Sequence, residues 1–191
     1  KGPSARTVQV ELPPFTLVAA TTRISLLSSP LRSRFSGGTF RLEFYSDAEI
    51  ASVLKRSAEL LTVNVEAPLL EQIAKRCRAT PRTANYLLKR CRDLAQLESK
   101  DLDKDIVEKT FDLLEIDTLG LTGPDRTLLL SIIEKFNGGP VGLNTMAAAT
   151  GEEMATIEDV LEPYLIRQGL IERTPRGRVA TSTAYSHIKL T

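Results

Sequence analysis

The sequence predicts a multidomain chain of the α/β and α classes, and three observations lead to this expectation. Residues 15–20 form an apolar run without alternation, which is typical of a strand in a sheet that is covered on both faces. Residues 46–116 contain four capped stretches with apolar side chains at helical spacing. Residues 117–191 place three helical stretches before two short extended segments. We therefore expect three domains, with boundaries at residues 1–45, 46–116 and 117–191.

The first domain is expected to hold two strands, at residues 15–20 and 39–44, joined by a polar loop. Ligands of open α/β sheets bind at the carboxyl ends of strands, and Thr22 follows the apolar run at such a place. Arg34 lies further along the same loop. Two strands and a loop cannot bury a core of their own. Because the chain also begins at Lys1 rather than at a methionine, we expect a fragment whose partner strands belong to another part of the protein.

The second domain is expected to be a small helical bundle. Ser46 and Glu49 have the spacing of a capping box, which predicts the start of its first helix. Pro68 suits the first turn of the second helix, and Thr80 precedes another proline at the start of the third. Asp103 is a typical N-cap for the fourth helix.

The third domain is expected to combine three helices with a β-hairpin. The helices are expected at residues 124–136, 145–149 and 152–168. Asn144 is expected to cap the second helix. The side chains of the third helix that are expected to face the core are Ile157, Val160, Leu161, Tyr164 and Leu165. Extended segments at 170–174 and 178–183 follow, joined by a turn, and this order of elements is that of a winged helix.

The charges of this domain indicate how it would bind DNA. A helix that reads sequence offers Arg, Lys, Asn or Gln to base edges, whereas residues 152–168 carry five acidic residues and one arginine. The turn of the hairpin instead brings Arg173, Arg176 and Arg178 together around Gly177. We infer phosphate contacts by these arginines without sequence choice, with a log-log salt slope of about −2.7 for three contacts. The alternative is a protein-binding winged helix with solvated arginines, and the spacing leaves it open.

The composition excludes several classes of function. A net charge of +1 over 191 residues gives no general attraction for nucleic acid. One histidine, His187, and two cysteines, Cys77 and Cys91, are too few for a metal site or a Ser-His-Asp triad, and we expect both cysteines to be reduced core residues. None of the 11 glycines precedes a lysine, so the chain has no phosphate-binding P-loop. Apolar runs stay far below the roughly 20 residues of a membrane helix, so we expect a cytoplasmic protein without a membrane partner.

Seven segments of the sequence closely resemble one protein family. They are residues 12–23, 29–35, 42–45, 79–85, 138–143, 156–166 and 173–181. The most specific are the last two, which read TIEDVLEPYLI and RTPRGRVAT. In this order the segments resemble the RuvB family, the Holliday-junction branch-migration motors of bacteria among the AAA+ ATPases. The resemblance implies that the three domains are, in chain order, the end of an AAA+ core, its helical lid and a winged-helix DNA-binding domain.

The resemblance also implies an activity and partners. Members of the family form a ring, usually a homo-hexamer, that RuvA loads at a four-way junction and that pulls duplex arms by ATP hydrolysis. This activity serves homologous recombination, DNA repair and the SOS response, and RuvC is a further partner. We expect ATP and Mg²⁺ to bind only to the full-length bacterial protein. This chain alone is expected to be inactive, to bind neither cofactor and to hold no metal site.

Four residues match functional positions of the family. Arg34 matches the arginine finger, which a subunit offers in trans to the triphosphate of its neighbour, and Arg32 stands beside it. Thr22 matches a sensor whose hydroxyl orients the attacking water. Tyr45 matches the aromatic residue beside the base, and Arg82 matches a lid arginine that reaches the phosphates. Without the resemblance, Arg34 would be interpreted as a loop ion-pair partner and Thr22 as a strand-end cap. Tyr45 would be interpreted as a core aromatic residue and Arg82 as a solvent-facing arginine.

Some positions depart from the family pattern. Ala79 replaces a usual glycine, and Thr183 and Ser186 stand where arginine is frequent. The segment after Phe35 is longer than usual. A second hypothesis, from another class, is a non-catalytic winged-helix regulator that binds DNA or protein. In such a protein Arg34 and Arg82 would meet no nucleotide.

Overall fold

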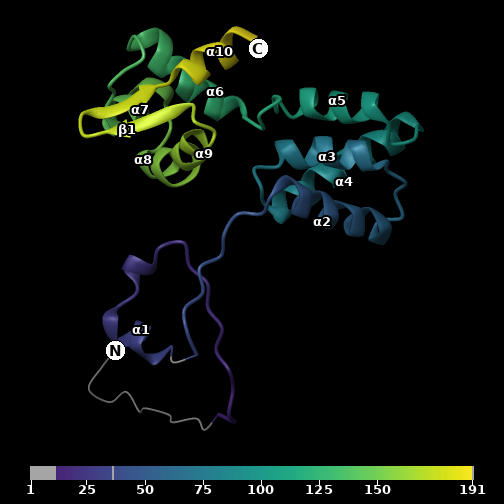
Figure 1. The fold of residues 1–191 in the computed structure, drawn as a ribbon, viewed down its shortest axis with the longest axis horizontal. Helices are drawn as coiled ribbons and strands as arrows, with labels where there is room; N and C mark the ends of the chain where they lie inside the picture. The colour runs from purple at the N-terminus through teal and green to yellow at the C-terminus, as the bar shows by residue number, and fades with distance from the viewer. Residues whose placement is uncertain (1–11, 36, 191) are drawn as a thin grey trace, which may run out of the picture. The chain divides into compact units, whose positions relative to one another are not determined.

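The structure is a computed structural model and describes residues 12–35 and 37–190 (Figure 1). The chain divides into two compact units, Lys1–Leu42 and Glu43–Thr191, and each is described by itself. Among the described residues no helix is long and apolar enough to cross a membrane.

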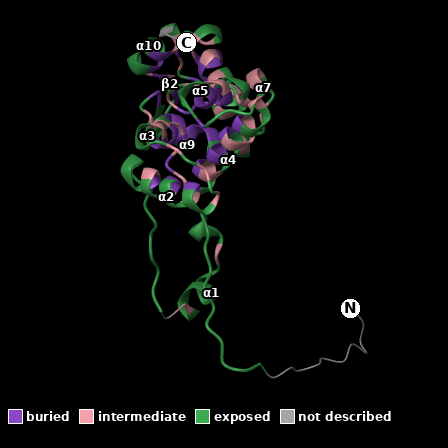
Figure 2. Cartoon of the chain, turned by 90° about the vertical axis from the view of Figure 1, so that its right-hand side faces the viewer, coloured by how far each residue is buried: buried purple, intermediate pink, exposed green. Residues whose placement is uncertain are grey.

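The first unit contains two short helices and no strand among its described residues. The helices are η1 (Ile24–Leu26), a 3₁₀ turn, and α1 (Ser29–Arg34). The strands expected at 15–20 and 39–44 are therefore not formed, and that prediction is wrong for this chain. A strand is held by hydrogen bonds to a neighbouring strand, and the described residues provide none. Apolar side chains of both segments are exposed, and Figure 2 shows this part almost entirely in the colour of exposed residues.

Four helices open the second unit, as the capping signals predict. They are α2 (Asp47–Leu60), α3 (Ala67–Arg76), α4 (Pro81–Glu98) and α5 (Lys104–Leu113). The capping box is present, because Ser46 N donates to Glu49 Oε2 at 2.8 Å and Glu49 N donates to Ser46 Oγ at 3.3 Å. Asp103 Oδ1 accepts from Ile106 N at 2.9 Å and starts α5. Side-chain hydrogen bonds thus fix where α2 and α5 begin, whereas α3 and α4 have a proline in their first turn and no side-chain cap.

These helices share one apolar core. Its fully buried members include Ile50, Leu54, Ile73, Leu87, Leu88, Ile106 and Phe111. Burial of each such side chain contributes about 1.5–3 kcal/mol. Cys77 and Cys91 are free and fully buried in the same core, as the sequence predicts. Burial raises the pKa of both thiols, that of Cys91 to about 11, so neither is a reactive thiolate near neutral pH.

The remaining elements of the second unit build the winged helix. Its helices are α6 (Gly123–Leu130) with the π-helical turn η2 (Ser131–Lys135), α7 (Leu143–Thr150), α8 (Met154–Thr156) with the π-helical turn η3 (Ile157–Leu161), α9 (Glu162–Arg167) and α10 (Ser182–Leu190). The hairpin consists of β1 (Ile171–Thr174) and β2 (Gly177–Ala180), paired antiparallel with Ile171 opposite Ala180. Val141 adds a bridge to Arg178, so the connection before α7 extends this small sheet.

Three details of the winged helix differ from the prediction. Asn144 does not cap α7, which begins at Leu143 with Gly142 at its N-cap and no side-chain cap. Val160 is 55% exposed rather than inward, because the π-helical turn η3 changes the facing of residues along this helix. The second extended segment ends at Ala180, where the chain soon enters α10, a helix that the sequence analysis missed.

Candidate functional sites in the lid and the wing

Thr22 and Arg34 both lie on the surface of the first unit. Thr22 stands in a bend just before η1, and Arg34 is the last residue of α1, two residues after the equally exposed Arg32. The helix therefore ends on arginine side chains that solvent, or a neighbouring molecule, can reach. Tyr45 and Arg82 belong to the other unit.

Tyr45 stands immediately before the capping box of α2 and is 45% exposed. Hydrogen bonds from the backbone N–H and the hydroxyl of Ser46 lower the pKa of Glu49, so this carboxylate stays ionised and holds the first turn. The cap fixes the chain direction next to Tyr45 and leaves its ring accessible. An accessible aromatic face of this kind can stack on a planar base.

Arg82 is exposed in the first turn of α4, directly after Pro81. Thr80 occupies the N-cap, but its hydroxyl bonds the hydroxyl of Thr83 at 2.9 Å and no backbone N–H. The N–H groups at this helix start thus lack a side-chain cap, and the positive end of an 18-residue helix favours an anion. A guanidinium beside such a helix start suits phosphate oxygens.

The three arginines of the wing have three different surroundings. Arg176, at the turn between β1 and β2, is exposed and makes no ion pair with the described residues. Arg173 is 57% exposed and lies 3.1 Å from a carboxylate oxygen of Glu158 and 3.8 Å from one of Glu162. Arg178 is only 7% exposed. The expected cluster of three arginines is therefore divided, and only two of its side chains reach the surface.

Arg178 forms a buried ion pair with Glu162. Its Nη2 and Nε lie 2.7 and 3.0 Å from Glu162 Oε2, and the Glu162 side chain is 2% exposed. This pair ties β2 to α9, and we assign Arg178 a structural role in place of a DNA contact. The sequence carries no signal for it, because Glu162 stands in an acidic stretch that reads as a solvated face.

Gly177 also serves the fold of the wing. A Cβ at this position would lie 2.5 Å from the carbonyl oxygen of Val141, and the backbone has a φ of +137°. The glycine is thus required by the close approach of the segment before α7.

The described residues offer no metal site. They contain no group of three or more His, Cys, Asp or Glu side chains that is arranged to hold an ion. The single histidine instead pairs with Asp117, with 2.8 Å between His187 Nε2 and Asp117 Oδ2, and links α10 to the connection that leads into the winged helix.

A four-helix lid followed by a winged helix defines a class, the AAA+ proteins that carry a DNA-binding domain. Three family models agree with this class along the chain. The Holliday junction DNA helicase RuvB P-loop domain matches residues 1–42, the RuvB AAA lid domain 45–117 and the RuvB C-terminal winged helix domain 118–189. The chain belongs to the RuvB family, as the resemblance predicts, and the predicted fold class is confirmed.

Solved structures of RuvB from Thermotoga maritima support this result. The Holliday junction branch migration motor of that organism is 51% identical, with a TM-score of 0.84 over 92% of this chain and 59% of that chain. An arginine-to-alanine variant is 50% identical with the same TM-score and coverage. A lysine-to-arginine variant is 49% identical, with a TM-score of 0.84 over 96% of this chain and 61% of that chain. The chain thus spans about three fifths of the length of these relatives.

Proposed function

We propose that this chain is part of an ATP-driven DNA motor that moves Holliday junctions during homologous recombination and DNA repair. The observation that supports the proposal most is the ordered match of three consecutive RuvB domains, at 51% identity to a branch migration motor. The activity is proposed for the full-length protein. The 191 residues contain no P-loop, and by themselves they are proposed to be inactive.

In this motor Arg34 is the arginine finger. It acts in trans, and its exposed position at the end of α1 lets it reach a triphosphate held by the next subunit. There it stabilises the negative charge that develops on the transferred phosphoryl group. Thr22 is proposed as the sensor whose hydroxyl orients the attacking water.

Tyr45 and Arg82 are proposed to contact the nucleotide within their own subunit. The Tyr45 ring packs on the base, and Arg82 with the start of α4 meets the phosphates. ATP with Mg²⁺ supplies the phosphoryl group and the metal charge when bound. Among the described residues there is no group of three or more His, Cys, Asp or Glu side chains that could hold an ion.

Arg176 and Arg173 are proposed to contact DNA phosphates without sequence choice. Arg176 has no ion-pair partner among the described residues, whereas Arg173 would exchange its contact with Glu158 for a phosphate. Two contacts give a log-log salt slope of about −1.8 per subunit, so several subunits must act together for firm binding. We further propose a homo-hexamer in the bacterial cytoplasm that works with RuvA and RuvC and serves the SOS response.

The proposal is tested by Arg34→Ala in the full-length protein. We expect ATP turnover to be lost while the affinity for ATP stays unchanged, because the finger acts on the transition state of a neighbouring site. The control is Arg56→Ala, which removes an exposed arginine of α2 and should keep turnover. Measured hydrolysis rates and nucleotide titrations check both.

The same measurement separates the motor from a non-catalytic winged-helix regulator. If the protein were a regulator, its wild-type form would not hydrolyse ATP, and Arg34→Ala would change nothing in the measured rate. Wild-type turnover in the Arg34 variant would reject the assignment of the finger.

A further inference from the structure

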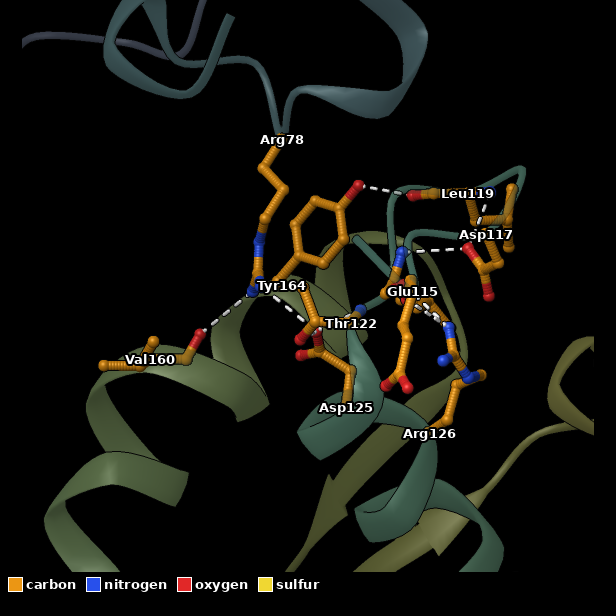
Figure 3. A network of polar contacts seen from close by, with 10 residues as sticks. Arg78, Glu115, Asp117, Leu119, Thr122, Asp125, Arg126, Val160 and Tyr164 are labelled. Carbon is orange, nitrogen blue, oxygen red and sulfur yellow. Dashed lines mark hydrogen bonds and ion pairs between the residues drawn. The ribbon is translucent and has the colours of Figure 1, made fainter. Parts of the chain in front are cut away.

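The turn between α3 and α4 carries a side chain that leaves the lid. Arg78 and the next residue, Ala79, both have left-handed backbone conformations, with φ of 58° and 54°. This pair of residues turns the chain sharply before Pro81 starts α4. The Arg78 side chain, 20% exposed, extends from the turn to the winged helix, as Figure 3 shows.

The guanidinium of Arg78 makes three contacts there, each with a different group. Nη1 lies 3.1 Å from Asp125 Oδ2, and Nη2 donates to the carbonyl oxygen of Val160 at 3.3 Å. Its Cζ is 4.1 Å from the centroid of the Tyr164 ring. A planar guanidinium can bond at its edge and stack at its face at the same time, which an ammonium cannot do. We call Arg78, Asp125, Val160 and Tyr164 the lid–wing joint.

The partners of Arg78 in the winged helix are held in place by their own hydrogen bonds. Asp125 is fully buried, and its Oδ2 also accepts from Thr122 N at 2.9 Å and from Thr122 Oγ1 at 2.6 Å, which caps α6. The Tyr164 hydroxyl donates to the carbonyl oxygen of Leu119 at 2.6 Å. Burial raises the pKa of Tyr164, so this donor keeps its proton. Arg78 thereby contacts α6, η3 and α9, and these elements cannot turn away from it separately.

A second contact joins the same helix to the chain just before the lid. Arg167, one helical turn after Tyr164 on α9, places its Cζ 4.3 Å from the centroid of the Phe44 ring. Phe44 directly precedes Tyr45, and Arg78 stands four residues before Arg82. One face of α9 is thus linked to the chain next to both residues that are proposed to contact the nucleotide.

The connection between lid and winged helix is closely packed against the lid. Gly120 has a φ of +75°, and a Cβ there would lie 2.6 Å from the carbonyl oxygen of Arg76 and 3.1 Å from the Tyr164 hydroxyl. The connection therefore packs against the end of α3, beside the turn that carries Arg78. A short, packed connection transmits a rotation more directly than a flexible linker.

We propose that Arg78 is a positioning residue that makes the winged helix turn with the lid. It acts through Asp125, Val160 and Tyr164, and it converts a nucleotide-dependent movement of the α3–α4 turn into a movement of the wing. The proposal rests on the proposed function, which supplies the nucleotide at Arg82. Removing Arg78 would leave the buried carboxylate of Asp125 without its cation and would free the winged helix from the turn.

The first test measures the distance between lid and wing in the full-length protein. Cysteines introduced at the exposed Leu97 on α4 and Glu172 on β1 carry spin labels, while Cys77 and Cys91 are buried. Pulsed electron resonance then records distance distributions without nucleotide, with ADP and with a non-hydrolysable ATP analogue. We expect the unmodified joint to give one narrow population that shifts as a whole between nucleotide states. Arg78→Ala should broaden the distribution and abolish the shift.

Two further variants make this test specific. Arg90→Ala is the matched control, because Arg90 pairs with Asp93 and stacks on Tyr86, all within α4, and it should behave as the unmodified protein. Arg78→Lys keeps a charge opposite Asp125 and protects the fold, but it lacks the planar fork and should still broaden the distribution. A narrow distribution with the normal shift in either Arg78 variant would overturn the proposal.

The second test separates the joint from the proposed function. We expect Arg78→Ala to keep ATP turnover while junction migration per ATP falls by about tenfold, a typical size for coupling between sites. Equal losses of turnover and migration would place Arg78 in the ATPase chemistry and overturn its role as a joint. If the wild-type protein moves no junction, the proposed function fails, and the distance distribution without nucleotide still decides the joint.

Discussion

Gly120 and Gly151 show how one backbone conformation serves two purposes. Their φ values are +75° and +76°, yet a Cβ would strike the Arg76 carbonyl oxygen at 2.6 Å from Gly120 and would meet nothing within 4 Å from Gly151. The first glycine allows two parts of the chain to pack closely. The second only ends α7, with its N–H donating to Ala147 O at 2.9 Å.

We expect the two alanine variants to differ in stability. Gly151→Ala should lower the free energy of unfolding by about 1–2 kcal/mol, the cost of a left-handed conformation for an L-residue. Gly120→Ala carries the same cost and must also displace the Arg76 carbonyl, so we expect a loss of about 3 kcal/mol or more. Urea denaturation of both variants measures the difference. Equal losses would contradict the close packing between α3 and the connection to the winged helix.

Some residues have structural roles that the sequence pattern does not predict. Ala79, which the resemblance expects to replace a glycine, has a left-handed conformation with a φ of 54°. Arg78 has no special signal in the sequence, since its partners Asp125 and Val160 lie 47 and 82 positions away. The caps Ser46 and Asp103 were predictable because their hydrogen bonds are local, whereas the contacts of Arg78 were not because they are distant.

The wing depends on the pairing of β2 with α9 through Arg178 and Glu162. Arg178→Met should lower the free energy of unfolding by about 3–5 kcal/mol, because it removes the close, buried cation of Glu162 and leaves only the longer contact with Arg173. Replacing both partners with apolar residues, as in Arg178→Met with Glu162→Leu, should recover most of the loss. Arg176→Ala is the control and should change stability by no more than about 0.5 kcal/mol, as an exposed side chain does. A loss in the Arg176 variant as large as that in Arg178→Met would contradict this division of roles.

For binding to duplex DNA we expect a change at Arg176 to matter, although the same change should have little effect on stability. Arg176→Ala removes one of two proposed phosphate contacts, so the log-log salt slope per subunit should flatten from about −1.8 to about −0.9. Titrations of a duplex at several salt concentrations measure this slope for the wild-type protein and for Arg176→Ala. The control is Lys189→Ala, which removes an exposed charge of α10. An unchanged slope would show that the tip of the wing does not touch phosphates.

Among the elements, helices were predicted better than strands, for a physical reason. In α2 and α5 the cap and the apolar face lie within a few residues of each other, as the bond from Ile106 N to Asp103 Oδ1 shows. The apolar segment at 15–20 would need hydrogen bonds from neighbouring strands, which the described residues do not contain. The helix α10 was missed because its inward positions Ala184 and His187 include a small and a polar side chain and give a weak apolar pattern.

At the scale of the whole molecule, the proposed sites form a chain of connected parts. Arg82 and Tyr45 are proposed to meet the nucleotide, the lid–wing joint links the adjacent turn to the winged helix, and Arg176 lies at the tip of the wing. Arg34 belongs to the other unit and is proposed to serve a neighbouring subunit. In this account each ATPase site needs residues of two subunits, and each subunit pulls DNA with the wing that its own lid turns.

Mixing two inactive subunits tests most directly whether an ATPase site is shared between neighbouring subunits. Full-length Arg34→Ala and Arg82→Ala proteins should each have lost ATP turnover. In a ring assembled from equal amounts of both, some interfaces combine an intact Arg82 with an intact Arg34 from the neighbour. Random assembly restores about a quarter of the sites, so junction-stimulated turnover should return to about that fraction of the wild-type rate. A mixture that stays as inactive as either variant alone would contradict an ATPase site shared between subunits.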